Sequence, residues 1–273
     1  MANWTPYLVI FKLLSPMHVG WRKIGNLQQT RPYVIGKTMW GAMTACLANQ
    51  TIEKDYKKMG EDVDDQLAFT YFYPTINEKE VNNFHFPWYN WDDFSWKYLG
   101  SYVSTALQKG RGAEEGSLHE IEFISPITRD DEPVFLIGYI FEKEGCTLLW
   151  KDVLNLLQLG GERGYGWGRV EHLPLIEIKT NETIFGLEYM NNQKTNRPNL
   201  IVPENTKLFA HTYADNLNAI GTIEPVVGRE TDQLTGNFGK NCSSAQICWT
   251  PESKVKEKVS VQIEKKGLWR KCN

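Results

Sequence analysis

Long apolar runs are absent from this sequence. No stretch of 18 or more apolar residues occurs among its 273 residues, so we expect no transmembrane helix and no membrane partner. The first residues, MANWTPYLVIFKLLSP, contain a short apolar run but no basic leader and no small-residue cleavage site. We therefore expect this run to be a first strand rather than a signal peptide.

Cysteine and histidine patterns typical of metal sites are also absent. None of the five cysteines belongs to a Cys-x-x-Cys pair, and no two histidines have the spacing of metal ligands. The odd number of cysteines argues against a disulfide scaffold. We therefore expect no metal and no cofactor, and a reducing cytoplasmic location.

An excess of positive charge is missing as well, since the net charge is −3. Screening limits the reach of each charge to roughly 10 Å at ordinary salt, so local basic patches can still exist in a nearly neutral chain. Residues 254–271, for example, contain seven basic side chains and two acidic ones. Such a patch can neutralise phosphates or protect a strand edge, and both interpretations stay open.

Hydrophobic periodicity predicts an α+β protein. Residues 37–49 place apolar side chains three and four positions apart, as in an amphipathic helix, and residues 148–159 form a second helical segment that ends at two glycines. Strands are expected at 5–14, 67–73, 121–127, 134–142 and 169–179, with the third and fourth joined as a hairpin. This order is the ferredoxin-like (RRM-like) βαββαβ plan, in which two helices pack on one face of an antiparallel sheet.

Two domains are expected along the chain. Residues 1–179 would form the ferredoxin-like domain, with an aromatic-rich insertion at about 75–120. Residues 180–273 would form a β-rich C-terminal lobe with strands at 207–213, 245–249 and 258–265. This lobe is either an appended unit or a degenerate second ferredoxin-like domain.

The most informative segment is GGERGYGWGRV, residues 160–170. Five glycines in nine residues lie directly between a helix and a strand, and successive amides of such a loop can form a concave nest for phosphates. Arg163 and Arg169 add charge, while Tyr165 and Trp167 offer flat rings to a base or sugar. The loop is neither a Walker nor a Rossmann motif, because it follows a helix rather than opening one. The alternative is a helix cap with a tight turn.

Three motifs in order carry a resemblance to a known family. These are SPMHVG at residues 15–20, RPYVIGKTMWGAM at 31–43 and GGERGYGWGRV at 160–170. Together they resemble the RAMP superfamily of CRISPR-associated proteins. GTIEPVVGRE, residues 221–230, is similar to the subunit class that caps the 5′ end of the guide in type III complexes. Two departures are the missing proline before Gly36 and the acidic Glu162 within the loop.

The resemblance implies a non-catalytic RNA-binding subunit of a type III-like CRISPR effector. Its partners would be the guide RNA (crRNA), whose 5′ handle it would hold, the large subunit and backbone subunits of the complex, and target RNA indirectly. Its role would be antiviral defence. The residues expected to contact RNA are His18, Arg22, Lys23, Arg31, Lys37, Gly160, Gly161, Arg163, Gly164, Tyr165, Gly166, Trp167, Gly168, Arg169 and Arg229.

Two other functions remain open from the sequence. An endoribonuclease of the same fold, processing precursor guide RNA or cleaving target RNA, would need an acid–base group, for which His18 or His119 is the candidate. A protein-interaction module without RNA contact would use the aromatic segment 84–98 as its interface.

Overall fold

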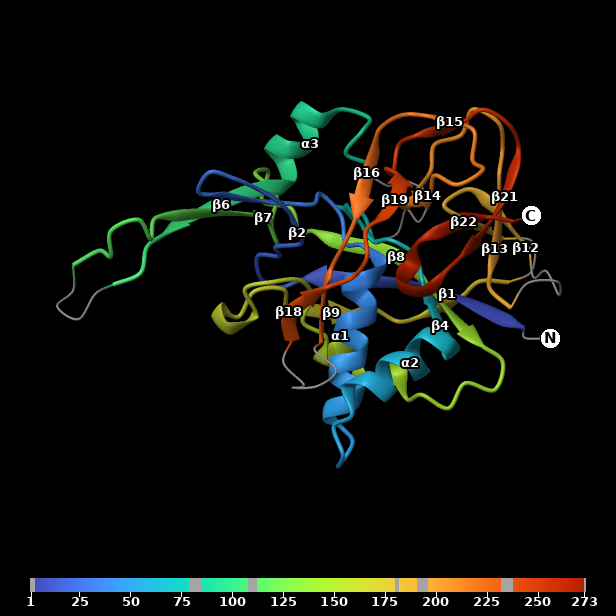
Figure 1. Ribbon diagram of the computed structural model, residues 1–273, viewed down its shortest axis with the longest axis horizontal. Helices are drawn as coiled ribbons and strands as arrows, with labels where there is room; N and C mark the ends of the chain where they lie inside the picture. Colours follow the sequence, from blue (N-terminus) through green and yellow to red (C-terminus); the bar gives the residue numbers. More distant parts are fainter. Residues whose placement is uncertain are drawn as a thin grey trace.

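The computed structural model describes most of the chain (Figure 1). The described residues are 3–78, 85–107, 112–179, 182–190, 196–231 and 238–272. Among them, no helix is long and apolar enough to cross a membrane.

A six-stranded sheet forms the centre of the N-terminal part. β1 and β8 pair antiparallel from Trp4↔Lys143 to Lys12↔Phe135, and the strand order is β10-β1-β8-β4, with β9 also on β1 and β5 also on β8. Side chains of a strand alternate between its two faces, and both faces of β1 are buried in separate apolar clusters. The strands are β1 (Trp4–Leu13), β4 (Leu67–Phe69), β5 (Tyr73–Thr75), β8 (Phe135–Lys143), β9 (Val170–His172) and β10 (Ile176–Glu177).

Helical segments cover one face of this sheet. α1 (Gly36–Asn49) buries Met39, Met43 and Leu47, a stripe with a period of four residues that points at the odd-numbered side chains of β1. α2 (Tyr56–Gln66) begins at Asp55, whose side chain accepts a hydrogen bond from the Lys58 amide. The 3-10 helix η1 (Trp150–Leu156) completes the layer. The order β1, α1, β4, β8, η1, β9 follows the expected plan, and the α+β fold class is confirmed.

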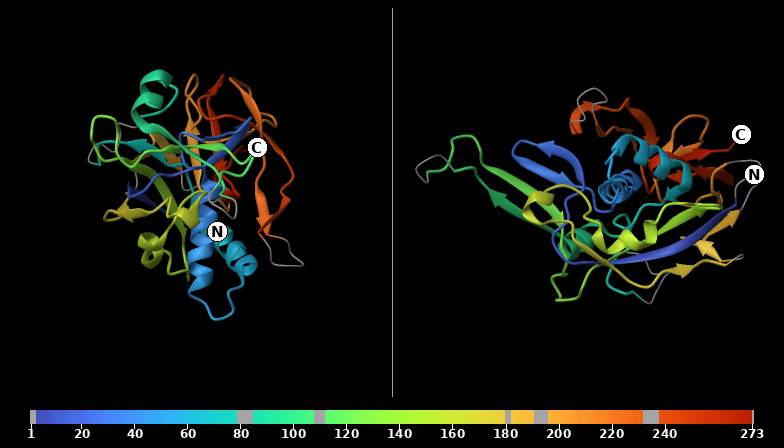
Figure 2. Two further views of the ribbon diagram at one scale, coloured as in Figure 1. Left: turned by 90° about the vertical axis from the view of Figure 1, so that its left-hand side faces the viewer. Right: turned by 90° about the horizontal axis from the view of Figure 1, so that it is seen from below.

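A four-stranded sheet extends away from this body (Figures 1 and 2). Its order is β2-β3-β7-β6, with β3 and β7 parallel and the other pairs antiparallel. The short helix α3 leads directly into β6. These elements are β2 (Gly20–Ile24), β3 (Leu27–Thr30), α3 (Trp91–Tyr98), β6 (Leu99–Ser104) and β7 (His119–Ile124).

The C-terminal part consists of strands and one 3-10 helix in the residues described. Its main sheet has the order β11-β12-β13-β21-β22-β14-β19-β16, and its apolar side chains share a cluster with the even-numbered residues of β1. The elements are β11 (Thr183–Ile184), β12 (Leu187–Met190), β13 (Asn199–Val202), β14 (Thr212–Tyr213), β15 (Ala219–Ile220), β16 (Ile223–Val226), β17 (Arg229–Thr231), β18 (Phe238–Cys242), β19 (Gln246–Trp249), β20 (Lys254–Val255), β21 (Val259–Ile263), η3 (Lys265–Gly267) and β22 (Trp269–Lys271).

Two predicted elements differ from the structure. The segment predicted as a second α-helix is shorter and of 3-10 type, because Gln158 bridges to Arg169 and the Leu159 amide donates to the Gly168 carbonyl, which draws the chain out of the helix. The predicted hairpin of 121–127 with 134–142 does not form as a ladder. β7 pairs instead with β6 and β3, and the turn is closed by the isolated bridge Ile127↔Pro133 and the hydrogen bond from the Val134 amide to the Pro126 carbonyl.

Candidate nucleic-acid interface

The ends of the glycine-rich loop are fixed by backbone contacts. Gly160 has φ +82°, and a Cβ on it would lie 2.3 Å from the His18 carbonyl oxygen. Gly168 has φ +78°, and a Cβ there would lie 1.9 Å from the Leu159 carbonyl oxygen. The amides of Gly161 and Gly168 donate to the carbonyls of His18 (2.8 Å) and Pro16 (2.7 Å). The SPMHVG segment and the loop therefore form one structural unit.

The middle of the loop is exposed to solvent. Arg163–Tyr165 form a single 3-10 turn (η2), and the Tyr165 side chain is 81% exposed. A Cβ on Gly164 would meet no atom within 4 Å, so no contact within the protein requires a glycine there. Arg163 is also exposed. This part of the loop is free to contact a ligand.

Three amides of the glycine-rich loop donate hydrogen bonds within the protein. The amides of Gly161 and Gly168 are used as described above, and that of Gly166 donates to the Arg163 carbonyl at 3.0 Å. These three amides therefore have partners within the protein. A phosphate at these positions would be contacted by side chains such as Arg163.

Trp167 connects the loop to the four-stranded sheet. Its ring meets Phe123 edge-on, with centroids 5.2 Å apart, and Tyr102 with centroids 6.3 Å apart. Strand pairing aligns Lys23, Gln28, Ile121 and Tyr102 in one row, and directly paired residues share a face. We call this side of the sheet the aromatic face, defined by Lys23, Tyr102, Phe123 and Trp167.

Arg22 lies on the opposite face of the same hairpin. Its Nε donates to Gln29 Oε1 (2.6 Å), and its guanidinium lies 4.1 Å from the centroid of the Trp21 ring. All five residues of β2 are exposed. The structure therefore separates Arg22 from the aromatic face, although both belong to one exposed sheet.

Arg31 is buried in a charged network instead of facing solvent. Its Nη1 lies 2.8 Å from Glu224 Oε1, and the Trp21 Nε1 donates to Glu224 Oε2 (3.2 Å). His211 Nε2 donates to Glu224 Oε1 at 2.5 Å, while its Nδ1 accepts from the Tyr71 hydroxyl at 2.7 Å. Glu224 thus joins the β2–β3 hairpin to the C-terminal lobe.

The pKa values are consistent with one negative and one positive charge in this network. Burial lowers the pKa of His211, so its ring is neutral near pH 7 and Nε2 carries the hydrogen. Burial alone would raise the pKa of Glu224, but the hydrogen bond from His211 and the charge of Arg31 bring it down to about 2. Sequence reasoning missed Glu224, because its partners at 31, 71 and 211 are distant along the chain.

The remaining predicted residues are dispersed. The half-buried Lys37 lies against Gly228, since a Cβ on that glycine would be 2.1 Å from Lys37 Nζ. The backbone of Arg229 begins β17, but its side chain lies outside those that the structure describes. Arg169 is exposed, and its amide donates to Ser15 Oγ (2.9 Å).

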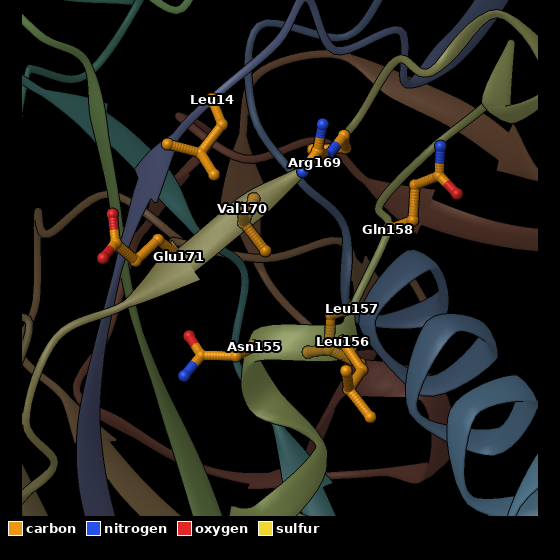
Figure 3. A pocket seen from close by; sticks show the side chains of 8 residues that line it. All are labelled: Leu14, Asn155, Leu156, Leu157, Gln158, Arg169, Val170 and Glu171. Atoms are coloured by element: carbon orange, nitrogen blue, oxygen red, sulfur yellow. The ribbon is translucent and has the colours of Figure 1, made fainter.

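A cavity of about 480 Å³ lies beside the end of the loop (Figure 3). Arg169 and Gln158 lie on one side of it, and Asn155 and Glu171 lie on the other. Leu14 and Val170 form part of its wall. Its charges are of both signs, so the cavity has no preference for an anion.

Both candidate acid–base histidines have protein partners. His18 is buried, and its Nδ1 is hydrogen-bonded to the Glu122 carbonyl at 2.7 Å. His119 contacts Ser104 Oγ through Nε2 (3.0 Å) and the Ser117 carbonyl through Nδ1 (2.9 Å). In the described part of the chain, no cluster of His, Cys, Asp or Glu side chains has the arrangement of a metal site.

The antiparallel sheet covered by helices on one face, with the glycine loop fixed to the end of β1, defines an α+β protein. The RAMP superfamily model matches residues 10–171, more than half of the chain. The chain belongs to the RAMP superfamily, and the resemblance carried by the motifs at 15–20, 31–43 and 160–170 is confirmed.

Solved structures share this fold at low sequence identity. One similar chain comes from a cryo-EM structure of the Type III-B Cmr-beta bound to cognate target RNA and AMPPnP, with a TM-score of 0.52, 13% identity, and coverage of 92% of this chain and 86% of that chain. Another comes from Cmr-beta bound to cognate target RNA, with a TM-score of 0.50, 12% identity and coverage of 91% and 86%. Among curated proteins, none matches the chain.

Proposed function

We propose that this protein is a non-catalytic RNA-binding subunit of a type III-like CRISPR effector complex, where it holds the 5′ handle of the guide RNA. One observation carries the proposal: the exposed middle of the glycine-rich loop adjoins the aromatic face of a sheet that extends from the body. Membership of the RAMP superfamily and the likeness to chains of RNA-bound Cmr-beta support it.

The chemistry of this surface suits single-stranded RNA. Exposed rings such as Tyr165 and Tyr102 can stack on unpaired bases, while Lys23 and Arg163 can neutralise phosphates. Phosphate contacts position a strand and base contacts specify it, so the rings would carry any sequence preference. The bonding of His18 and His119 to structural groups favours binding without cleavage over the endoribonuclease alternative.

A labelled repeat RNA tests the proposal. Binding without cleavage is the expected result, and Tyr165→Ala should weaken it by about 1–3 kcal/mol, the usual contribution of one stacked base. Tyr89→Ala is a matched control, because Tyr89 is also well exposed (68%) but precedes α3. Equal affinities for the two variants would remove the loop from the RNA site. Metal-free cutting that is lost in His18→Ala or His119→Ala would establish the endoribonuclease instead.

The surface of α3 favours a protein contact, which would be with the large subunit or a backbone subunit of the complex. Trp91 and Trp96 are about half exposed (47% and 52%), and Asp92 and Asp93 occupy the first turn. Acidic side chains repel RNA, while exposed tryptophans are typical of protein interfaces. Trp96→Ala should reduce co-purification with the complex and leave RNA affinity unchanged.

A further inference from the structure

Strands β16 and β19 form an apolar ribbon at one edge of the main C-terminal sheet (Figure 1). β16 is the last strand in the order of that sheet and pairs antiparallel with β19. The pairs Ile223↔Trp249 and Pro225↔Ile247 share one side of the ribbon, because directly paired residues lie on the same face of a sheet. Ile223 and Ile247 are 48% and 51% exposed, and Pro225 is exposed as well. We call this side the apolar face, defined by Ile223, Pro225, Ile247 and Trp249.

The opposite side of the ribbon is packed against the rest of the protein. Cys248 is buried, and its pair partner Glu224 lies 2.8 Å from Arg31 Nη1. On the apolar face, the half-buried Trp249 ring is held by a hydrogen bond from its Nε1 to the Leu217 carbonyl (3.3 Å). The fold therefore holds the ribbon in place, and a partner would meet a preformed surface rather than one that it must order.

Charged side chains are almost missing from this part of the chain. Residues 219–228 and 243–251 contain one of them, Glu224, although 23% of all residues are charged. Glu224 lies on the opposite side of the ribbon, since it pairs with the buried Cys248. RNA binding depends on cationic side chains that neutralise phosphates. The apolar face is therefore unsuited to RNA and suited to the apolar side chains of another protein.

The free edge of β16 does not favour strand pairing. The Thr250 amide donates to the Thr222 carbonyl at 2.9 Å, and the direction of hydrogen bonding alternates along an antiparallel strand, so the backbone of Pro225 faces the free edge. Proline has no N–H group, which leaves this edge without a donor in the middle of the strand. An added strand would need a continuous row of donors and acceptors. A partner would therefore contact the side chains of the apolar face rather than extend the sheet.

The size of the apolar face argues against a second copy of this chain as the partner. Two paired strands of four residues cover roughly 130 Å², given the usual spacings along and between strands. A stable interface between two proteins buries about 800 Å² on each of them. A subunit that an assembly also holds through other contacts can use a smaller surface, because those contacts raise its effective concentration there. The apolar face therefore suits a heteromeric assembly better than a dimer.

We propose that the apolar face is a docking surface for another protein subunit of the complex, which covers Ile223, Pro225 and Ile247 with uncharged apolar side chains. The choice of a complex subunit as partner rests on the function proposed above. The docking surface is a protein contact in addition to the one at α3.

Co-expression of this chain with the other subunits of its complex, followed by purification through one of those subunits, tests the proposal. Ile247→Glu and Ile223→Glu should each lower the amount of this chain in the purified complex at least tenfold, because docking would bury a carboxylate without a counter-charge. Ile176→Glu is the matched control, since Ile176 on β10 is also an isoleucine with 48% exposure. It should join the complex like the wild type. Thermal unfolding of the isolated chains checks that all three variants fold.

Two measurements on the isolated chain separate the other occupants. Ile247→Glu should bind labelled repeat RNA as tightly as the wild type, and weaker binding would make RNA the occupant and overturn the inference. In sedimentation velocity the wild type should be a monomer. A wild-type dimer that Ile247→Glu dissociates would make a second copy the occupant, which also overturns the inference.

Failure of the inference and failure of the proposed function give different results. Equal recovery of Ile247→Glu, Ile223→Glu and the wild type in the complex would overturn the inference and leave the proposed function in place. A wild-type chain that joins none of the other subunits would refute the proposed function, and this choice of partner with it.

Discussion

The two sheets of the N-terminal part differ in how far their residues are buried. Seven of the nine residues of β8 are buried, because the six-stranded sheet has packed layers on both faces. All five residues of β2 are exposed, and Tyr102 on β6 is 58% exposed. Only the inner residues of the four-stranded sheet, such as Ile121 and Ile124, are part of the core, whereas β2 and Tyr102 are exposed. Exposed rings such as Tyr102 are available to contact a ligand, and the proposed RNA site uses this sheet for that reason.

The glycine-rich loop spans both regions. Its ends contact the backbone of residues 16–18 and 159 and belong to the packed body. Its middle, with Gly164 and Tyr165, belongs to the exposed surface. The glycines at the ends of the loop are therefore required by packing, whereas those in its middle are not. Substitutions at the ends and in the middle distinguish the two cases.

The largest effect is expected for Gly168→Ala. A methyl group would overlap the Leu159 carbonyl oxygen, 1.9 Å away, and the backbone at φ +78° is unfavourable for alanine. We expect a loss of about 4 kcal/mol or more in the free energy of unfolding. Gly164→Ala should change it by less than about 0.5 kcal/mol, since no atom lies within 4 Å. Urea denaturation of both variants measures the contrast, and equal stabilities would show that the ends of the loop are no more constrained than its middle.

The next effect concerns the link between the exposed hairpin and the body. Glu224→Gln leaves the buried Arg31 without its counter-charge, and breaking a buried pair costs roughly 3–5 kcal/mol. We expect the free energy of unfolding to fall by about 3 kcal/mol, at the lower end of this range, because the glutamine side chain still accepts one hydrogen bond. Glu188→Gln on β12 is a suitable control, since this glutamate is exposed on the surface of the C-terminal lobe. A stable Glu224→Gln protein would mean that the hairpin is held by its strand pairing alone.

The same carboxylate predicts a pH dependence. The pKa of Glu224 is about 2 in the folded protein, below its ordinary 4.5, so its stabilising effect is complete above pH 4.5 and is lost as the pH falls toward 2. The fall from 4.5 to about 2 corresponds to about 3 kcal/mol. The difference between the wild-type and Glu224→Gln stability curves measures this effect together with the change in His211, which donates to the carboxylate. The difference should shrink as the pH falls from 5 to 2, and a constant difference would contradict the assignment.

The sequence predicted local features well and distant contacts poorly. The first strand and the first helix follow from alternation and from the Met39, Met43 and Leu47 stripe, because these patterns depend only on neighbours along the chain. The partner of β7 was assigned to the wrong strand, since a turn at 128–133 forms without continuing as a ladder. The local sequence does not show whether a strand pairs with the next strand along the chain or with a strand of another sheet.

The contacts of the candidate site could not be predicted from the local sequence either. Arg22 and Arg31 are close in the sequence and both were predicted to contact RNA, but burial separates them. The burial of Arg31 depends on Glu224 and His211, almost two hundred residues away. The glycine-rich loop lies between η1 and β9, as expected, and the amides of Gly161, Gly166 and Gly168 donate within the protein.

The smallest effect, on RNA affinity alone, is expected for Arg22. This exposed side chain has no part in the core, so Arg22→Ala should change the free energy of unfolding by less than about 0.5 kcal/mol. If Arg22 contacts a phosphate, the variant should bind all RNA sequences more weakly, with the slope of log affinity against log salt reduced by about one. Arg31→Ala should instead lower the free energy of unfolding and leave the salt dependence of RNA affinity unchanged. An unchanged slope for Arg22→Ala would confine the RNA to the aromatic face, where Lys23 and Trp167 lie. A reduced slope for Arg22→Ala, together with weaker RNA binding by Tyr165→Ala, would require the RNA strand to cross from one face of the sheet to the other.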